Sequence, residues 1–137
     1  MIGKTFDTAF IQDKIDNSGI ECLDDFNLES WLGTDYNLAL VSSTGDVALF
    51  EFIPESNGTF IGHYLFETRG KEALVSAQQF LRMMFMLYGA DMIIGMVPVE
   101  KKNVCLFTKW LGFTDDGVVD TLNGKAKLFT LERKDYK

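Results

Sequence analysis

One short stretch of the sequence combines a glycine with two cationic side chains directly ahead of a long helical pattern. Arg69, Gly70 and Lys71 make up this stretch. The first amides of a helix have no partner within the helix, and the helix dipole favours an anion at that end. Glycine also lets an anion reach the backbone, because it has no Cβ. These residue types predict an anion-binding loop, beside which Glu72 is either a helix-stabilising acid or a source of repulsion.

Groups that transfer protons near neutral pH are few in this sequence. His63 is the only histidine, and histidine is the side chain whose ordinary pKa lies nearest neutrality. Glu51 and Glu67 are alternative bases, because they lie in or beside the strands predicted around His63. A single histidine in a strand is more often a packed or surface residue than a catalytic one. Both interpretations of His63 therefore stay open.

Metal and disulfide chemistry are not indicated by the sequence. The two cysteines, Cys22 and Cys105, are far apart and lack the spacing of a metal site. One histidine adds too few ligands to complete a zinc site with them. We therefore expect no metal ion and two free, buried thiols in a reducing compartment.

The charge balance narrows the choice of partners. The 137 residues include 13 basic and 20 acidic side chains, which gives a net charge of −7. Such a surface repels phosphate backbones, which disfavours nucleic acid as a partner and suits a cationic substrate or a basic protein. The N-terminus lacks an apolar segment of signal-peptide length, and Met92 to Val99 is too short to cross a bilayer. We expect a soluble, cytoplasmic protein.

Periodicity predicts a single mixed α/β domain over residues 1–137, with a helical part at 1–33. Apolar residues recur at helical spacing from Phe6 to Ile15, and a second helix or irregular arm is expected over 23–32. Three antiparallel strands, a long helix, a strand, a helix and a C-terminal hairpin follow. These elements span, in that order, 36–41, 47–53, 59–66, 70–88, 92–97, 104–111 and 117–132.

Local signals support the second half of this order. The strand after the long helix is expected to lie parallel to the strand before it, as in a βαβ unit. Asn123-Gly124 is a strong hairpin turn signal. Met83, Met84 and Met86 in the long helix are interpreted as core residues, with an adaptable binding surface as the alternative.

Three local features resemble the GNAT (Gcn5-related N-acetyltransferase) superfamily. The loop at 68–74 resembles the family's Arg-Gly-Lys-rich pyrophosphate loop, and a short strand at 92–97 follows the long helix. The run at 109–113 resembles the family's last helix, which leads into Gly-Phe and the final hairpin. The resemblance covers 36–133, and it implies a central mixed sheet with helices on both faces and a C-terminal β-hairpin.

The resemblance also implies an acetyl-CoA site. The residues that it would place at the cofactor are Phe66, Glu67, Thr68, Arg69, Gly70, Lys71, Glu72, Ala73 and Asn103. Backbone amides near Phe66 and Glu67 would polarise the thioester carbonyl, and Asn103 is interpreted as a helix cap. The family has a glycine at the position of Glu72 and often a proton-donating tyrosine at the position of Thr108.

The function implied is transfer of an acetyl group from acetyl-CoA to an amine, with His63, Glu51 and Thr108 as candidate catalytic residues. The acceptor would be a small amine, a protein N-terminus or a lysine side chain, and a homodimer is compatible with this interpretation. Glu72 and Thr108 favour an alternative, because the sequence also resembles divergent GNAT-like proteins of tailed bacteriophages. Such a protein would lack catalysis and would act in head or virion assembly through phage structural proteins, in the host cytoplasm or the virion. A third alternative is a regulatory module that binds CoA without transfer.

Overall fold

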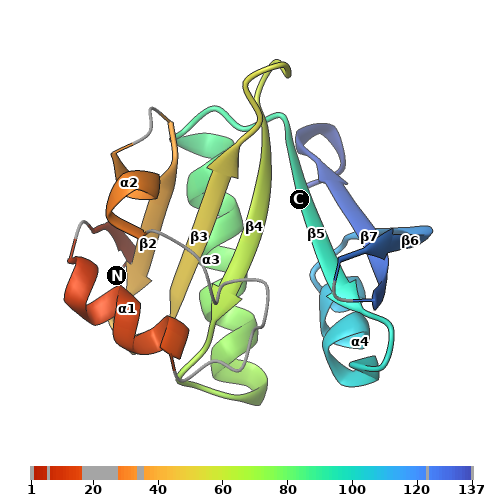
Figure 1. The fold of residues 1–137 in the computed structure, drawn as a ribbon, viewed down its shortest axis with the longest axis horizontal. Coiled ribbons are helices and arrows are strands. Elements are labelled where there is room, and N and C mark those ends of the chain that lie inside the picture. Colours follow the sequence, from red (N-terminus) through yellow and green to blue (C-terminus); the bar gives the residue numbers. More distant parts are fainter. Residues whose placement is uncertain (1, 6, 17–27, 34–35, 123, 137) are drawn as a thin grey trace.

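The computed structural model describes residues 2–5, 7–16, 28–33, 36–122 and 124–136, and this part forms a seven-stranded sheet with helices on both faces (Figure 1). The strand order is β1-β2-β3-β4-β5-β7-β6. Neighbouring strands are antiparallel except for β4 and β5, which are parallel. The elements are β1 (Ile2–Lys4), α1 (Thr8–Asp16), α2 (Leu28–Leu32), β2 (Leu38–Ser42), β3 (Val47–Phe52), β4 (Thr59–Leu65), α3 (Gly70–Met86), β5 (Met92–Pro98), α4 (Lys102–Trp110), β6 (Thr114–Thr121), β7 (Gly124–Glu132) and the 3₁₀ turn η2 (Arg133–Asp135).

The sheet separates two apolar cores. Ala48 and Phe50 of β3 belong to the core beneath α3, whereas the alternating Val47 and Leu49 belong to the core beneath α1 and α2. Successive side chains of a strand point to opposite faces, so one strand can serve both cores. α4 contributes Cys105 to the core on the α3 side. Figure 1 shows α1 and α2 in front of the sheet and α3 behind it.

α3 is the longest helix of the described part, and its amphipathic pattern fixes how it packs. Its buried residues recur at helical spacing and are Ala73, Ser76, Ala77, Phe80, Leu81, Met84 and Phe85. The methionines of α3 differ in burial, because Met84 lies on the buried face whereas Met86 is 74% exposed. The core interpretation therefore holds for Met84 and is wrong for Met86.

The predicted order from the first middle strand to the hairpin is confirmed. The helical prediction for the N-terminal part is wrong at Ile2–Lys4, which form β1 at the edge of the sheet, antiparallel to β2. Three residues are too few to show a strand period in the sequence. The formation of β1 therefore depends on its pairing with β2, which local sequence does not reveal. Residues 17–27, which include the first half of the predicted second helix, and the turn residue Asn123 lie outside the described residues, and the second half of that helix forms α2.

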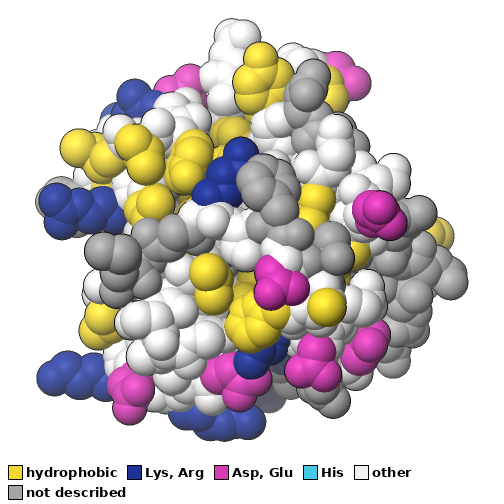
Figure 2. Space-filling view, turned by 90° about the vertical axis from the view of Figure 1, so that its left-hand side faces the viewer, with side chains coloured by type: hydrophobic (Ala, Val, Ile, Leu, Met, Phe, Trp, Pro, Cys, Tyr) yellow, Lys and Arg dark blue, Asp and Glu magenta, His cyan; other side chains and the backbone are white. Residues whose placement is uncertain are grey.

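Three features of the described part of the chain concern metal ligands, thiols and membrane-spanning helices. No group of three or more His, Cys, Asp or Glu side chains in this part of the chain could hold a metal ion. Cys105 is a buried free thiol, whereas Cys22 lies outside the described residues. None of the described helices is long and apolar enough to span a membrane. On the face shown in Figure 2, several hydrophobic side chains gather toward the upper left, and several acidic side chains lie along the lower edge.

Candidate functional site

β4 and β5 are paired over only three residues and then separate. Their parallel register runs from Thr59 opposite Met92 to Ile61 opposite Ile94. Beyond this point β4 pairs with β3 and β5 pairs with β7, and Figure 1 shows β4 and β5 diverging toward their carboxyl ends. A Cβ on Gly95, in the diverging part of β5, would meet no atom within 4 Å. The parallel ladder thus ends at Ile61 and Ile94, and the backbone groups of β4 and β5 beyond it have no partner in the other strand.

The amino-terminal end of α3 is open. Arg69 precedes the helix in an extended conformation, and no side chain of the described residues caps the first amides. Gly70 has a φ of +58°, in the left-handed region that favours glycine, and a Cβ there would meet no atom within 4 Å. Arg69, Lys71 and Glu72 are exposed around it. This helix end is accessible to an anion, with two cations and one carboxylate at its rim.

A buried carboxylate holds the loop between β4 and α3. Asp46, directly ahead of β3, is completely buried. Its Oδ1 accepts hydrogen bonds from the amides of Glu67 at 2.7 Å and Thr68 at 2.9 Å. Its Oδ2 accepts hydrogen bonds from Thr68 Oγ1 at 2.6 Å and Thr44 Oγ1 at 3.2 Å. The Asp46 carboxylate therefore already accepts hydrogen bonds from two amides of the loop. The amides that remain for a ligand begin in the first turn of α3.

The Asp46 carboxyl is ionised at neutral pH. Burial alone would raise its pKa, because burial disfavours the charged form. Hydrogen bonds from Thr68, from Ser76 and from the amides of Thr68 and Glu67 outweigh that effect and lower the pKa below its usual value. The negative charge of Asp46 is thus a permanent part of the loop's environment.

An ion pair joins the same loop to the opposite face of the sheet. Lys14 of α1 donates a hydrogen bond to Glu67 Oε1, and its ammonium nitrogen lies 5.2 Å from the centre of the Phe10 ring. Glu67 is therefore engaged through its amide by Asp46 and through its carboxylate by Lys14. The expectation that the Glu67 amide polarises a thioester is wrong, because that amide already donates to a buried carboxylate.

Tyr64 lies in the diverging part of β4 and points to the side of α3 and α4. Its ring stacks on Phe66 with 5.5 Å between ring centres and on Phe80 with 6.3 Å. Phe66 meets Phe107 of α4 at 5.5 Å. The Tyr64 hydroxyl oxygen is buried and has no hydrogen-bond partner among the described residues. Burial raises the pKa of this phenol, so it stays protonated at neutral pH.

The three predicted catalytic residues lie on two sides of the sheet. His63 pairs with Leu49, and Glu51 is two residues after Leu49, so both point to the side of α1 and α2. Burial lowers the pKa of His63, which keeps its imidazole neutral. Thr108 lies on α4, on the other side, and its Oγ1 donates to the Val104 carbonyl oxygen at 2.8 Å. The structure brings His63 and Glu51 to one face and separates them from Thr108.

The predicted cofactor loop, residues 66–73, runs without interruption from the end of β4 into the first turn of α3. Ala73 is buried beneath the helix, so its side chain faces the core. Asn103 does not cap α4, because it is the second residue of that helix and Lys101 occupies the cap position. A side chain satisfies the first helical amides from the residue ahead of the helix. The interpretation of Asn103 as a cap is therefore wrong.

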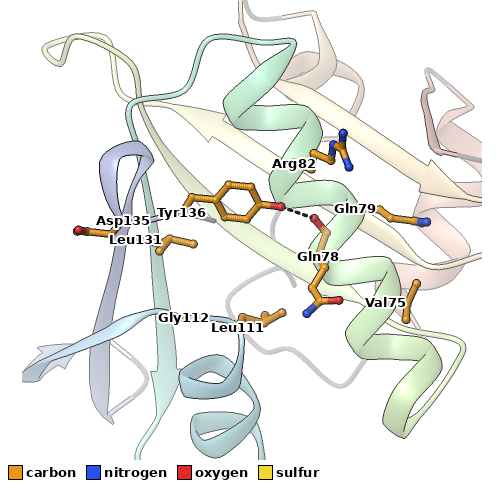
Figure 3. Close-up of a pocket in the computed structure, with 9 residues that line it drawn as sticks. All are labelled: Val75, Gln78, Gln79, Arg82, Leu111, Gly112, Leu131, Asp135 and Tyr136. Carbon is orange, nitrogen blue, oxygen red and sulfur yellow. Dashed lines mark hydrogen bonds between the residues drawn. The ribbon is translucent and has the colours of Figure 1, made fainter.

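A groove of about 520 Å³ lies between α3, the end of α4 and the C-terminal segment (Figure 3). The Tyr136 hydroxyl donates to the Gln78 carbonyl oxygen at 3.2 Å, and its ring packs against Phe85 with 5.1 Å between centres. The lining residues are Val75, Gln78, Gln79, Arg82, Leu111, Gly112, Leu131, Asp135 and Tyr136. None of them belongs to the loop at 66–73, so this groove is distinct from the open end of α3.

Sequence reasoning did not single out two residues of this region. Asp46 follows a glycine in a turn cluster, where aspartate is common, and its loop partner Glu67 lies 21 residues further along the chain. Tyr64 alternates with Phe60 and Phe66 and has the pattern of a core residue. Neither pattern carries a signal of the buried contacts, which arise only when distant segments meet.

No protein-family model matches the sequence, and no curated protein sequence matches it significantly. Solved structures do match. A mutant form of the spermidine/spermine N-acetyltransferase SpeG from Vibrio cholerae has a TM-score of 0.78 and 13% identity, covering 99% of this chain and 95% of that chain. A chimera of Vibrio cholerae SpeG and hSSAT has a TM-score of 0.77 and 10% identity, covering 99% of this chain and 98% of that chain. An uncharacterized protein of Bacillus halodurans has a TM-score of 0.66 and 13% identity, covering 80% of this chain and 65% of that chain.

The mixed sheet, the diverging β4 and β5 and the open end of α3 thus define a mixed α/β architecture. The fold is GNAT-like, as the agreement with the SpeG N-acetyltransferase structures over 99% of the chain shows. The predicted fold class is confirmed. The expected resemblance to bacteriophage proteins gains no support from these structures.

Proposed function

We propose that the protein transfers an acetyl group from acetyl-CoA to an amine. The observation that carries this proposal is the open amino-terminal end of α3, next to the point where β4 and β5 diverge. A helix end of this kind binds phosphate through its free amides and its dipole. Diverging strands beside it offer backbone groups to an extended polar chain.

The residues present fit acetyl-CoA at three points. Gly70 leaves open the space that a Cβ would fill, so a diphosphate can reach the amides of the first turn, with Arg69 and Lys71 as counter-charges. Gly95 leaves open space in the diverging region. The Tyr64 hydroxyl is a buried donor without a partner there. Acetyl-CoA, when bound, supplies an acetyl group activated as a thioester.

The opposite face provides a base for the incoming amine. His63 lies there in its neutral form because burial lowers its pKa, and a neutral imidazole accepts the proton that an ammonium must lose before it attacks. The Glu51 carboxylate, exposed on the same face, attracts the cationic acceptor. The net charge of −7 favours approach of the same class of substrate.

The acceptor is an amine, and a polyamine is the first to test, because two solved structures with this fold are spermidine N-acetyltransferases. Release of free CoA thiol would be followed with acetyl-CoA and either spermidine or a lysine-containing peptide. We expect amine-dependent thiol release above the hydrolysis seen without amine. His63→Asn should lower kcat, since asparagine fills a similar space without accepting a proton. Absence of amine-dependent release across small amines, peptide N-termini and lysine peptides would contradict the proposal.

A second candidate is a GNAT-fold protein without catalysis that acts through protein contacts. The Thr108 hydroxyl is engaged by the Val104 carbonyl, and Glu72 adds a negative charge at the loop. The ring contact between Phe66 and Phe107 joins β4 to α4. This candidate predicts that acetyl-CoA produces neither binding heat nor a thermal shift.

A further inference from the structure

One buried polar atom lacks an explanation within the fold. Among the described residues, the Tyr64 hydroxyl oxygen is the only buried side-chain nitrogen or oxygen without a hydrogen-bond partner. A buried hydroxyl without a partner destabilises the folded state, because it gives up its hydrogen bond to water. Phenylalanine would fill the same space without that loss. The hydroxyl is therefore a candidate for a role that the ring alone does not have.

Tyr64 occupies the part of the fold where the thioester is expected. The last paired residue of β4 toward β5 is Ile61, so Tyr64 lies three residues into the diverging part. Its ring belongs to the core on the α3 and α4 side, where it stacks on Phe66 and Phe80. Phe66 in turn touches Phe107 of α4. The hydroxyl is thus held in the wall between the diverging strands and the two helices.

α4 itself offers no free hydroxyl in its described residues. Its one hydroxyl side chain, Thr108, donates to the Val104 carbonyl oxygen within the same helix at 2.8 Å. The buried thiol of Cys105 points to the Pro98 carbonyl oxygen at 4.0 Å. A thiolate that leaves in this region therefore needs its proton from another element.

We propose that Tyr64 is the proton donor to the departing thiolate, a catalytic residue placed on β4 instead of α4. This inference rests on the proposed acetyl transfer. The amine nitrogen forms its bond to the thioester carbonyl carbon, the carbon–sulfur bond breaks, and the electron pair leaves on sulfur. Tyr64 gives its phenolic proton to that sulfur, and the tyrosinate regains a proton released by the acylated nitrogen. No oxidant, reductant or further reactant is required.

The phenol of Tyr64 is protonated before the reaction, because burial raises its pKa. The same shift makes the phenol a weaker acid, so its proton moves only as negative charge develops on the sulfur. A negative charge that develops on sulfur in a water-poor site strengthens the hydrogen bond from the hydroxyl at the moment when it is needed.

Tyr64→Phe removes the hydroxyl alone and tests the inference. We expect the melting temperature of this variant to lie between that of the wild type and about 3 °C above it, because a buried group without a partner is removed. Its kcat should fall by about 10²-fold or more, the range expected for loss of a general acid, with the acetyl-CoA dissociation constant within about threefold. Tyr36→Phe is the matched control, since Tyr36 is 70% exposed and remote from the loop at 66–73, and it should leave both quantities unchanged.

A second substrate separates proton donation from positioning. With an acetyl thioester of an aryl thiol, whose thiolate leaves without protonation, the deficit of Tyr64→Phe in kcat/KM should shrink at least about tenfold. A Tyr64→Phe variant with wild-type kcat overturns the inference while the acetyltransferase proposal stands. An equal deficit with both thioesters, or a clear loss of melting temperature, also overturns it. Wild-type protein that binds no acetyl-CoA overturns both proposals together.

Discussion

Asp46 provides the sharpest test of how this sequence builds its loop. Its carboxylate accepts hydrogen bonds from the amides of Glu67 and Thr68 at 2.7 and 2.9 Å and from the hydroxyls of Thr68 and Thr44 at 2.6 and 3.2 Å, and it also interacts with the Ser76 side chain. Asp46→Ala removes all of these acceptor interactions and leaves two loop amides without a partner. Hydrogen bonds to a charged group contribute about 1.5–3 kcal/mol each, and stranded buried donors cost about 1–3 kcal/mol each. Since such terms are not additive and the buried charge itself is costly, we expect a net loss of about 3–5 kcal/mol.

Asp46→Asn separates the charge from the geometry. Asparagine keeps an acceptor oxygen for the two amides, and its NH₂ group can donate to the hydroxyls of Thr68 and Thr44, which then act as acceptors. We expect a loss of about 1–2 kcal/mol, clearly below that of alanine. The assay is urea unfolding at pH 7 followed by circular dichroism, with Asp120→Asn as the control, because Asp120 is exposed on β6. An Asp46→Ala cost below about 1 kcal/mol, or equal costs for both variants, would refute the reasoning.

The same residue predicts a dependence of stability on pH. The pKa of Asp46 in the folded protein lies below its usual value, so its contribution is fully present above the pKa of the unfolded chain, about 3.9. This contribution is lost as the pH falls through the lower folded-state pKa. Wild-type stability should therefore fall more steeply below about pH 4 than that of Asp46→Asn. Parallel slopes for the two proteins between about pH 4 and pH 2 would contradict the assignment.

Three further substitutions have distinct expected outcomes. Gly70→Ala should cost about 1 kcal/mol in urea unfolding, because φ is +58° although a Cβ would meet no atom within 4 Å; no measurable cost would argue against the left-handed conformation. Glu72→Gln should tighten acetyl-CoA binding a few-fold at low salt, because it removes a like charge beside the diphosphate, and this gain should fade at about 0.5 M salt. Calorimetric titration at the two ionic strengths measures the effect. A gain in affinity that persists at high salt would point to another cause. Thr108→Ala should leave kcat within about twofold, since its hydroxyl is bonded to the Val104 carbonyl and is not the proposed donor; a 100-fold loss would return Thr108 to the mechanism.

The elements that the sequence predicts well are those with a long, local period. α3 shows seven buried residues at helical spacing over its 17 residues. β1 has three residues, so no period is visible and its assignment depends on pairing with β2. Met83, Met84 and Met86 carry the same composition signal, yet only Met84 is fully buried, because burial depends on where α3 ends relative to the sheet.

The local part of the candidate site could be proposed from the sequence, and its assembled part could not. Arg69, Gly70 and Lys71 lie at the start of a helix and resemble a family pyrophosphate loop, so they predict an anion site that stays a prediction. The contact of Asp46 with the loop and the missing partner of Tyr64 depend on which distant segments meet. Neither feature can be recognised from residue spacing or composition. The resulting interpretation thus retains the predicted loop and moves the proton donor from Thr108 to Tyr64.

The central claim is that the open end of α3 binds acetyl-CoA, and calorimetric titration of the wild type and Gly70→Glu tests it most directly. Gly70→Glu places a carboxylate where the diphosphate is expected, so binding should be lost in this variant and retained in the wild type. Asn57→Glu adds the same charge at an exposed position in the turn between β3 and β4, and it should bind acetyl-CoA like the wild type. Equal binding by Gly70→Glu and the wild type, or no binding heat from the wild type at millimolar acetyl-CoA, would contradict the claim.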